Sequence, residues 1–230
     1  MPLDTSEPLI VGCVTSELAD GAVRAAEGGA DALELRMDLY EGGAEEALGD
    51  LESHAAAEDP FPVIATNRSA DEGGEWSGDE DRRIELLCDA AAHADAIDVE
   101  FSAEDEHRVR AYAAAEEADA ATICSFHDFD GTPSGVEMVE LVHEMAEEAN
   151  VAKLAVAPDD HGDVLGVLEL VHESEVPICA IAMGAIGSYS RVVAPALGSR
   201  LTYGALDDAT APGQLTVEQL ATFLETFGVR

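Results

Sequence analysis

The sequence predicts an α/β protein, a compact (β/α)8 TIM barrel whose closed parallel sheet is surrounded by helices. Short apolar runs alternate with longer amphipathic stretches eight times along the 230 residues, as expected for parallel strands joined by helical crossovers. No linker rich in Pro, Gly or Ser divides the chain, so residues 1–230 are expected to form one domain. Eight units in so short a chain favour a closed barrel over a doubly wound open sheet, which would leave two edge strands.

Each strand is predicted where a short apolar run is bounded by polar or turn-forming residues. The runs are Leu9–Val14, Ala32–Met37, Pro62–Thr66, Ala96–Glu100, Ala121–Phe126, Val151–Ala157, Pro177–Ala182 and Leu201–Ala205. Helices are predicted at Ser16–Glu27, Ala44–Ala56, Asp79–His93, Ala103–Ala115, Ser134–Glu148, Gly162–Glu173, Gly187–Leu197 and Thr216–Phe227. Ser16 and Thr216 stand where N-caps are expected, and Gln219 follows Thr216 at the capping-box spacing.

The charge balance is strongly acidic, with 49 Asp and Glu against 11 Lys and Arg and a formal net charge of -38. Nucleic-acid binding is excluded, because neutralising phosphates needs a basic surface. The acidic residues are scattered through periodic segments, which indicates a folded protein with an acidic surface rather than a disordered tail. Ten of the 11 basic residues are Arg and one is Lys. Such a surface suits a cytosol of high salt, where self-repulsion is screened, and so predicts a halophilic source.

No targeting or membrane segment is predicted. Residues 1–8 are polar and carry no basic residue, and the longest apolar run, Val176–Gly187, is shorter than the ~20 residues that span a bilayer. The cysteines contain no CxxC pair and lie in apolar segments: Cys13, Cys88, Cys124 and Cys179. Buried free thiols are therefore expected, in a reducing, cytoplasmic compartment, with no metal and no membrane partner.

Lys153 is the residue that points most clearly to chemistry. It lies within the sixth apolar run, where alternation places it on the same face as Ala155, with Leu154 and Val156 on the other. We expect Lys153 to point into the barrel, where small neighbours leave room for a ligand. An edge-strand lysine or a structural ion pair is the alternative, but this chain has no other lysine. An ε-amine whose pKa is lowered by burial or nearby cations suits imine formation with a carbonyl.

Further polar residues fall at the carboxyl ends of the predicted strands, where barrels carry their active sites. Glu34, Arg36 and Asp38 share one parity on the second strand, and a buried structural ion pair is the alternative interpretation. Arg68 ends the third strand, ahead of a Gly73-Gly74 loop that is expected to be mobile.

The remaining strands contribute further candidates. Asp98 and Glu100 share a face of the fourth strand, where they could orient neighbours. His127 follows the fifth strand as a candidate proton shuttle. Arg191 follows the seventh strand, and Thr210 and Gln214 lie in a Gly/Pro loop after the eighth. Together with Lys153 they favour imine chemistry on a small anionic polyol ketone.

These residues stand within motifs of one known family. The matching stretches are residues 34–38 (ELRMD), 66–74 (TNRSADEGG), 125–129 (SFHDF), 153–156 (KLAV), 183–191 (MGAIGSYSR), 198–203 (GSRLTY) and 211–214 (APGQ). The chain resembles the type I 3-dehydroquinate dehydratases of the shikimate pathway, and its composition suggests a halophilic archaeal member. The resemblance implies a lyase and homodimer that removes water in cis from 3-dehydroquinate, giving 3-dehydroshikimate for aromatic amino-acid biosynthesis, without a cofactor.

The resemblance also implies roles for individual residues. Lys153 would form the imine with the C3 ketone, and His127 would remove a C2 proton and then protonate the departing C1 hydroxyl. Glu72 would orient the histidine. The residues implied in substrate binding are Glu34, Leu35, Arg36, Arg68, Arg191, Thr210 and Gln214, with Arg191 as the carboxylate partner. Thr210 stands where the family usually has Ser. Thr keeps the hydroxyl but adds a methyl group.

Two alternatives and one tension remain. Another Schiff-base barrel, such as a class I aldolase, would share the lysine but require a phosphate site. A non-catalytic barrel that binds a carboxylate or a protein partner would leave the inward lysine unexplained. The net charge of -38 should raise the pKa of Lys153 and repel an anionic substrate. We expect local arginines to outweigh it.

Overall fold

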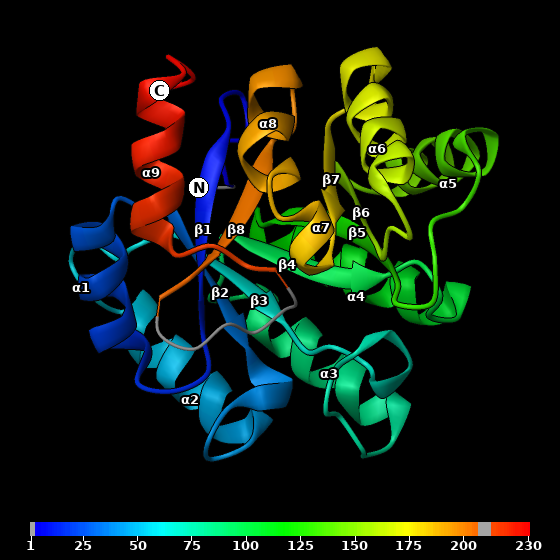
Figure 1. Ribbon diagram of the computed structural model, residues 1–230. Helices are drawn as coiled ribbons and strands as arrows, with labels where there is room; N and C mark the ends of the chain where they lie inside the picture. The colour runs from blue at the N-terminus through cyan, green and yellow to red at the C-terminus, as the bar shows by residue number, and fades with distance from the viewer. Residues whose placement is uncertain (1–2, 207–212) are drawn as a thin grey trace.

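The computed structural model describes residues 3–206 and 213–230, in which eight parallel strands form the wall of a barrel (Figure 1). The strands are β1 (Leu9–Val14), β2 (Ala32–Arg36), β3 (Val63–Thr66), β4 (Ala96–Glu100), β5 (Ala121–Asp128), β6 (Val151–Val156), β7 (Ile178–Ala182) and β8 (Leu201–Ala205). Their order is β7-β6-β5-β4-β3-β2-β1-β8. The sheet nearly closes where the backbone N–H of Arg200 donates to the carbonyl of Ile178, at 2.7 Å. The predicted barrel is confirmed.

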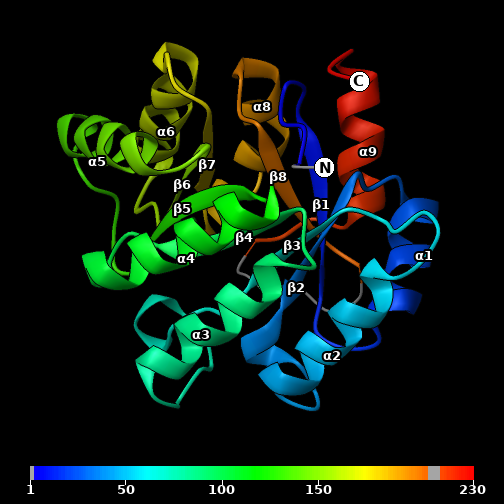
Figure 2. The same ribbon diagram turned by 180° about the vertical axis from the view of Figure 1, so that it is seen from behind.

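Helices surround the barrel on its outside (Figures 1 and 2). The long ones are α1 (Leu18–Gly28), α2 (Ala44–Ala55), α3 (Glu80–Ala91), α4 (Asp105–Ala118), α5 (Gly135–Glu148), α6 (His161–Glu173), α8 (Ser190–Leu197) and α9 (Val217–Thr226). Short turns of helix lie at η1 (Met37–Leu39), η2 (Ala70–Glu72) and α7 (Gly184–Gly187). The predicted helix Gly187–Leu197 is thus two pieces, and β5 continues two residues beyond the predicted Phe126.

The two predicted N-caps have different outcomes. Thr216 caps α9, with its hydroxyl accepting from the N–H of Gln219 at 3.2 Å and the Gln219 side chain accepting from the N–H of Thr216 at 3.0 Å. The prediction for Ser16 is wrong. The helix begins at Leu18, after Glu17, whose φ of 45° is left-handed and whose side chain makes no capping bond. A left-handed turn therefore takes the place of the side-chain cap expected there.

The alternation of the strands divides the core into two layers. Outward residues such as Leu33, Leu154 and Val156 pack under the helices, whereas inward residues such as Ile64 and Ile123 fill the barrel. Fully burying one such side chain contributes about 1.5–3 kcal/mol, so each layer contributes strongly to stability. The inward positions nearer the carboxyl ends carry polar side chains instead, and this places the candidate site.

Two predictions about the chain's chemistry can be compared with this fold. None of the four cysteines forms a disulfide; three are buried and Cys88 is half-buried. Across residues 3–206 and 213–230, no helix has both the length and the apolar character needed to cross a membrane.

Candidate active site

A cavity of about 200 Å³ opens at the carboxyl ends of the strands. Its wall includes eight of the predicted site residues: Glu34, Arg36, Arg68, Glu72, His127, Lys153, Arg191 and, from the segment before α9, Gln214. Cys13, Ala155, Ile181, Met183, Tyr203, Gly73 and Phe129 complete the wall. Residues that are distant in sequence meet here because every parallel strand ends at the same rim of the barrel.

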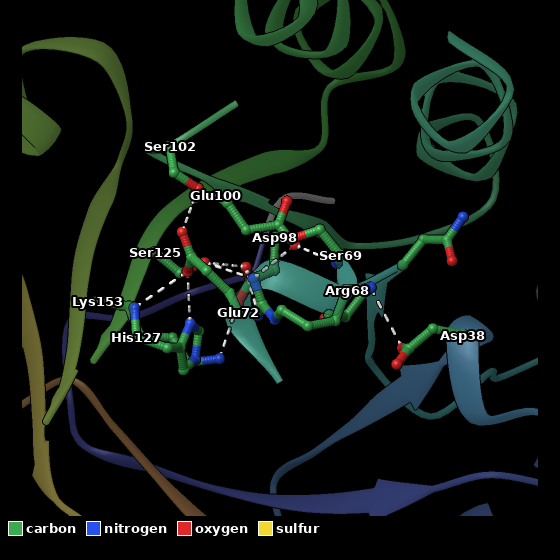
Figure 3. Close-up of polar contacts among 12 residues, drawn as sticks. Asp38, Arg68, Ser69, Glu72, Asp98, Glu100, Ser102, Ser125, His127 and Lys153 are labelled. Atoms are coloured by element: carbon green, nitrogen blue, oxygen red, sulfur yellow. Dashed lines mark hydrogen bonds and ion pairs between the residues drawn. The ribbon is translucent and has the colours of Figure 1, made fainter. Parts of the chain in front are cut away.

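Lys153 points into this cavity from β6, as predicted, and is 4 % exposed. Its Nζ lies 2.8 Å from Oδ2 of Asp98 and 3.5 Å from Oε1 of Glu34 (Figure 3 shows the pair with Asp98). Glu34 is itself oriented by the hydroxyl of Thr66, which donates to Oε1 at 3.0 Å, and by the thiol of Cys13, at 3.3 Å from Oε2. A buried amine with two carboxylates beside it is a well-defined cation site.

The expected direction of the Lys153 pKa is corrected by this geometry. Burial lowers the pKa of the amine and the charge of Arg68 acts in the same sense, but the carboxylates of Asp98 and Glu34 outweigh both, so the pKa is raised. The arginines do not prevail because Arg68 is turned toward the same Asp98, whereas two carboxylates contact or approach Nζ. In the free protein the amine is held as an ammonium.

The guanidinium of Arg68, which the resemblance implies in substrate binding, is bonded to buried side chains. Its Nη2 donates to Oδ1 of Asp98 at 2.8 Å, and its Nη1 donates to the hydroxyl of Ser125 at 2.7 Å and lies 3.2 Å from Glu100. Ser125 in turn donates to Oδ1 of Asp98 at 2.6 Å. These contacts use the guanidinium to orient Asp98, the nearest partner of Lys153. A positioning role follows, although Arg68 also borders the cavity.

Arg36 is partly engaged in the same way. Its Nε and Nη2 donate to the two oxygens of Asp38 at 2.9 and 2.7 Å, a bidentate pair within one short segment. Asp38 also accepts from the backbone N–H groups of Arg68 and Glu75, each at 3.2 Å. The pair therefore fixes the loop after β3, and Arg36 also lines the cavity.

His127 and Glu72 form a hydrogen-bonded pair beside Lys153 (Figure 3). The Nδ1 of His127 lies 2.9 Å from Oε2 of Glu72, which also accepts from the backbone N–H of His127 at 3.0 Å. The hydroxyl of Ser102 donates to the other oxygen of Glu72. Ser125 is paired with Lys153 across β5 and β6, so His127 lies one inward position nearer the rim than the lysine.

The ionisation of this pair favours proton transfer at His127. Burial lowers the pKa of His127 well below its ordinary value, and the charges of Arg68 and Lys153 lower it further. Burial raises the pKa of Glu72 to about 7, although the Ser102 hydrogen bond and Arg68 lower it. A neutral imidazole whose Nδ1–H donates to the carboxylate leaves Nε2 as the basic atom for a substrate.

The two glycines after β3 lie in close contact with neighbouring residues, and the mobility expected of this loop stays a prediction. Gly73 has a φ of 78°, and a Cβ there would lie 2.5 Å from Cζ of Phe129. A Cβ on Gly74 would overlap the carbonyl of Arg68. Phe129 stacks on His127, with 6.4 Å between ring centroids. The loop therefore approaches the histidine closely enough to bring Glu72 to it.

Arg191 differs from the other two arginines of the cavity. It is 2 % exposed, its Nη1 donates to the carbonyl of Tyr203 at 3.2 Å, and its Nε has no partner among the described residues. Within residues 3–206 and 213–230, no carboxylate forms an ion pair with it. Burial lowers its pKa. A buried guanidinium with unused donors is suited to an anionic ligand.

The remaining predicted binding residues, Gln214, Leu35 and Thr210, differ in their relation to the cavity. Gln214 lies on the cavity wall, with Nε2 at 3.5 Å from the thiol of Cys13. The side chain of Leu35 is buried in the layer between β2 and the helices and does not line the cavity, so its role in binding stays a prediction. Thr210 lies outside the described residues.

With this geometry established, the chain can be compared with known proteins. The family model for type I 3-dehydroquinase matches residues 9–230. The chain belongs to this family. Relatives include the 3-dehydroquinate dehydratases of Methanococcoides burtonii, 39 % identical over 95 % of this chain and 94 % of the relative, and of Methanocella arvoryzae, 40 % identical over 97 % and 98 %.

Solved structures of the family have the same architecture. The 3-dehydroquinate dehydratase of Geobacillus kaustophilus superposes with a TM-score of 0.88, at 25 % identity, covering 97 % of this chain and 92 % of that one. The type I enzyme of Clostridium difficile, described with covalently modified comenic acid, gives a TM-score of 0.85 at 29 % identity, covering 96 % and 92 %. The family assignment decides against the aldolase and non-catalytic alternatives.

Ser102, Cys13 and Tyr203 are among the residues around the cavity that were not predicted as site residues from the sequence. Parity gave a signal for two of them, because Cys13 and Tyr203 occupy inward positions of β1 and β8. Ser102 follows β4 at the rim but resembles many surface serines. Its contact with Glu72 depends on how two loops meet, which periodicity does not encode.

Proposed function

We propose that this chain dehydrates 3-dehydroquinate to 3-dehydroshikimate in the shikimate pathway, with Lys153 as the residue that binds the substrate covalently. The observation that carries the proposal is one buried lysine in a cavity, held at 2.8 Å from Asp98 and neighboured by the His127–Glu72 pair. Family membership and the named relatives support the reaction.

Imine formation is compatible with the raised pKa of Lys153. An ammonium and a ketone give an iminium and water, so the nitrogen is cationic both before and after the step. The amine is neutral only transiently, at the moment of attack on the carbonyl carbon. Asp98 and Glu34, which raise the pKa of Lys153, also stabilise the iminium cation. That cation is the electron sink that acidifies the adjacent C–H bond.

His127 then moves the proton. Its Nε2 takes a proton from C2 of the bound substrate, and the C–H electron pair forms an enamine with the former iminium. The imidazolium next gives that proton to the C1 hydroxyl, which leaves as water while the enamine returns to a conjugated iminium. Water hydrolyses this iminium, releasing 3-dehydroshikimate and Lys153. Glu72 fixes the ring through Nδ1 and stabilises the imidazolium between the two transfers.

Substrate orientation is assigned to the other polar groups that line the cavity. The guanidinium of Arg191, whose Nε has no partner among the described residues, is proposed to bind the carboxylate, because the guanidinium fork matches two oxygens. Arg36, the Glu34 carboxylate and Gln214 line the same cavity and can hydrogen-bond substrate hydroxyls. Thr210 remains a proposed contact from outside the described residues. Among the three arginines that line the described part of the cavity, Arg191 is the one without a carboxylate partner, and the substrate carries one carboxylate.

Reductive trapping tests the proposal. Borohydride transfers hydride to the iminium carbon and converts the link into a stable secondary amine. Incubation with 3-dehydroquinate and borohydride should inactivate the protein and add the mass of the reduced adduct to the peptide that contains Lys153. Because the chain has one lysine, the N-terminal amine is the only competing amine. Lys153→Arg keeps the charge but provides no neutral amine, and it should take up no label. An active protein whose Lys153 stays unmodified would overturn the covalent mechanism.

The source, compartment and assembly of the protein are inferred from composition and family resemblance. From composition we infer a halophilic protein, because 49 acidic residues stand against one lysine and 10 arginines; from the family resemblance we infer a cytoplasmic homodimer of single barrel domains. At 1 M salt the Debye length is ~3 Å, which screens surface repulsion and the repulsion of an anionic substrate. Activity and melting temperature should both rise between 0.1 and 1 M KCl, and a flat profile would contradict the inference. Sedimentation at the same salt measures the subunit number.

A further inference from the structure

Tyr203 is part of the cavity wall, and the proposed reaction gives it no role. Its side chain comes from β8, two strands along the barrel wall from Lys153, and is 4 % exposed. The Nζ of Lys153 lies 4.2 Å from the centroid of the Tyr203 ring, within the distance at which a cation is attracted to an aromatic face. The two residues are therefore in direct contact at the centre of the site.

The contact with Lys153 is made by the ring face and not by the hydroxyl. The phenol oxygen is buried and has no hydrogen-bond partner among the described residues. The hydrogen-bonding contacts of Nζ are with Asp98 and Glu34. The Tyr203 ring thus attracts Nζ through its quadrupole. The two carboxylates attract it through their charge and by accepting its N–H bonds.

We propose that Tyr203 is a positioning residue for Lys153, whose ring holds the cationic nitrogen in both its ammonium and its iminium states. This inference rests on the proposed function, since it concerns the iminium that Lys153 would form. Tyr203 would then join Asp98 and Glu34 as a group that stabilises the cationic nitrogen of Lys153.

The chemistry of the nitrogen explains why a ring is useful there. An ammonium has three N–H bonds, whereas a protonated imine has one, so imine formation removes two of the donors that face Asp98 and Glu34. The attraction of the ring depends on positive charge and does not need an N–H bond. It therefore persists when the hydrogen bonds are reduced in number. The buried position strengthens the attraction, because the nitrogen is shielded from water.

Two substitutions separate the ring from the hydroxyl. Tyr203→Phe keeps the ring and removes a buried hydroxyl without a described partner, so kcat should stay near its original value and the melting temperature should not fall. Tyr203→Leu removes the ring, and kcat should fall roughly tenfold with a smaller change in KM. The limb of kcat/KM that reports the Lys153 ionisation should move to lower pH in Tyr203→Leu and stay in place in Tyr203→Phe, because the ring favours the charged amine.

A second series covers the case in which Tyr203→Leu fails to fold. Phenylalanine analogues carrying one, two or three ring fluorines are incorporated at position 203, since they weaken the ring quadrupole while nearly conserving shape. The fraction of protein trapped by borohydride at saturating 3-dehydroquinate, and kcat, should both fall stepwise with fluorine number. Melting temperature, measured in parallel, should show no such order.

The outcomes distinguish this inference from the proposed function. Loss of trapping in the unsubstituted protein would overturn the proposed function itself. Normal trapping, with kcat unchanged in Tyr203→Leu or flat across the fluorinated series, would overturn only the role of the ring. An equal loss in Tyr203→Phe and Tyr203→Leu would assign the effect to the hydroxyl and also contradict the inference.

Discussion

The amino and carboxyl ends of the barrel interior are built from the same inward-facing positions of the same strands, but they differ in chemistry. A step of two residues along a strand replaces an apolar side chain with a polar one. The replacements are Ile64 to Thr66 on β3, Ala96 to Asp98 on β4, Ile123 to Ser125 on β5 and Val151 to Lys153 on β6. Both ends are buried to a similar degree, so solvent exposure does not explain the difference.

The difference shows that the amino end of the barrel interior serves stability, whereas the carboxyl end carries the reactive groups. At the amino end, apolar packing gains free energy without any requirement for partners. At the carboxyl end, each buried charge needs a partner, and the Arg68–Asp98–Lys153 set supplies them. Arg191 breaks that pattern, because its Nε has no partner among the described residues. The carboxyl end therefore offers a hydrogen-bond donor to a ligand, whereas the close packing of the amino end stabilises the barrel.

The largest effect is expected for His127→Ala. A general acid or base contributes about 10²–10⁴-fold to rate, and His127 is proposed to serve in two steps, so kcat should fall by several orders of magnitude. The borohydride adduct at Lys153 should still form. His143→Ala, on the exposed face of α5, is the matched control and should retain full kcat. Near-normal turnover in His127→Ala would remove the histidine from the mechanism.

A smaller effect is expected for Arg191→Gln. Losing charge-assisted hydrogen bonds to the substrate carboxylate should raise KM by about 100-fold while kcat changes less. Arg200→Gln is the control, because Arg200 precedes β8 at the opposite end of the barrel and donates to the carbonyl of Ser6. An unchanged KM in Arg191→Gln, measured in initial-rate assays, would assign carboxylate binding to another residue.

A pH shift is expected for Ser102→Ala. Activity requires the ionised Glu72 carboxylate as the Nδ1–H acceptor, so it should decline as pH falls through about 7, the Glu72 pKa. The Ser102 hydrogen bond lowers that pKa, and its removal raises it. The acid limb of kcat/KM should therefore move to higher pH, with little change on the plateau. Ser134→Ala, at the exposed start of α5, should leave the limb in place. A limb that moves to lower pH in Ser102→Ala would contradict this account of the pair.

The smallest effect belongs to the amino end of the barrel. Ile64→Val removes one buried methyl group, which should lower the free energy of unfolding by about 0.5–1.5 kcal/mol. The trapping yield and kcat should be unchanged, because Ile64 lies one inward step below the polar layer. Denaturant unfolding and steady-state assays provide the two measurements. A fall in kcat without a loss of stability would show that the two ends are not separable.

The strands and the inward position of Lys153 could be predicted because period-two alternation records which face is buried. The pairing of Arg68 with Asp98 could not, since it depends on how β3, β4 and β5 lie side by side. The approach of Glu72 to His127 came from family resemblance rather than from periodicity. Leu35 shows the reverse case, because its outward parity already opposed the binding role that the resemblance implied.

Because Lys153 is buried in the middle of β6, proteolytic cleavage at this residue can measure how often the barrel opens. A lysine-specific endoprotease has one internal site here, the bond between Lys153 and Leu154, because the sequence contains no other lysine. That bond becomes accessible when β6 leaves the barrel, so the appearance of fragments 1–153 and 154–230 follows the population of opened molecules. Cleavage kinetics would therefore measure barrel opening in any salt the protease tolerates, without an introduced label.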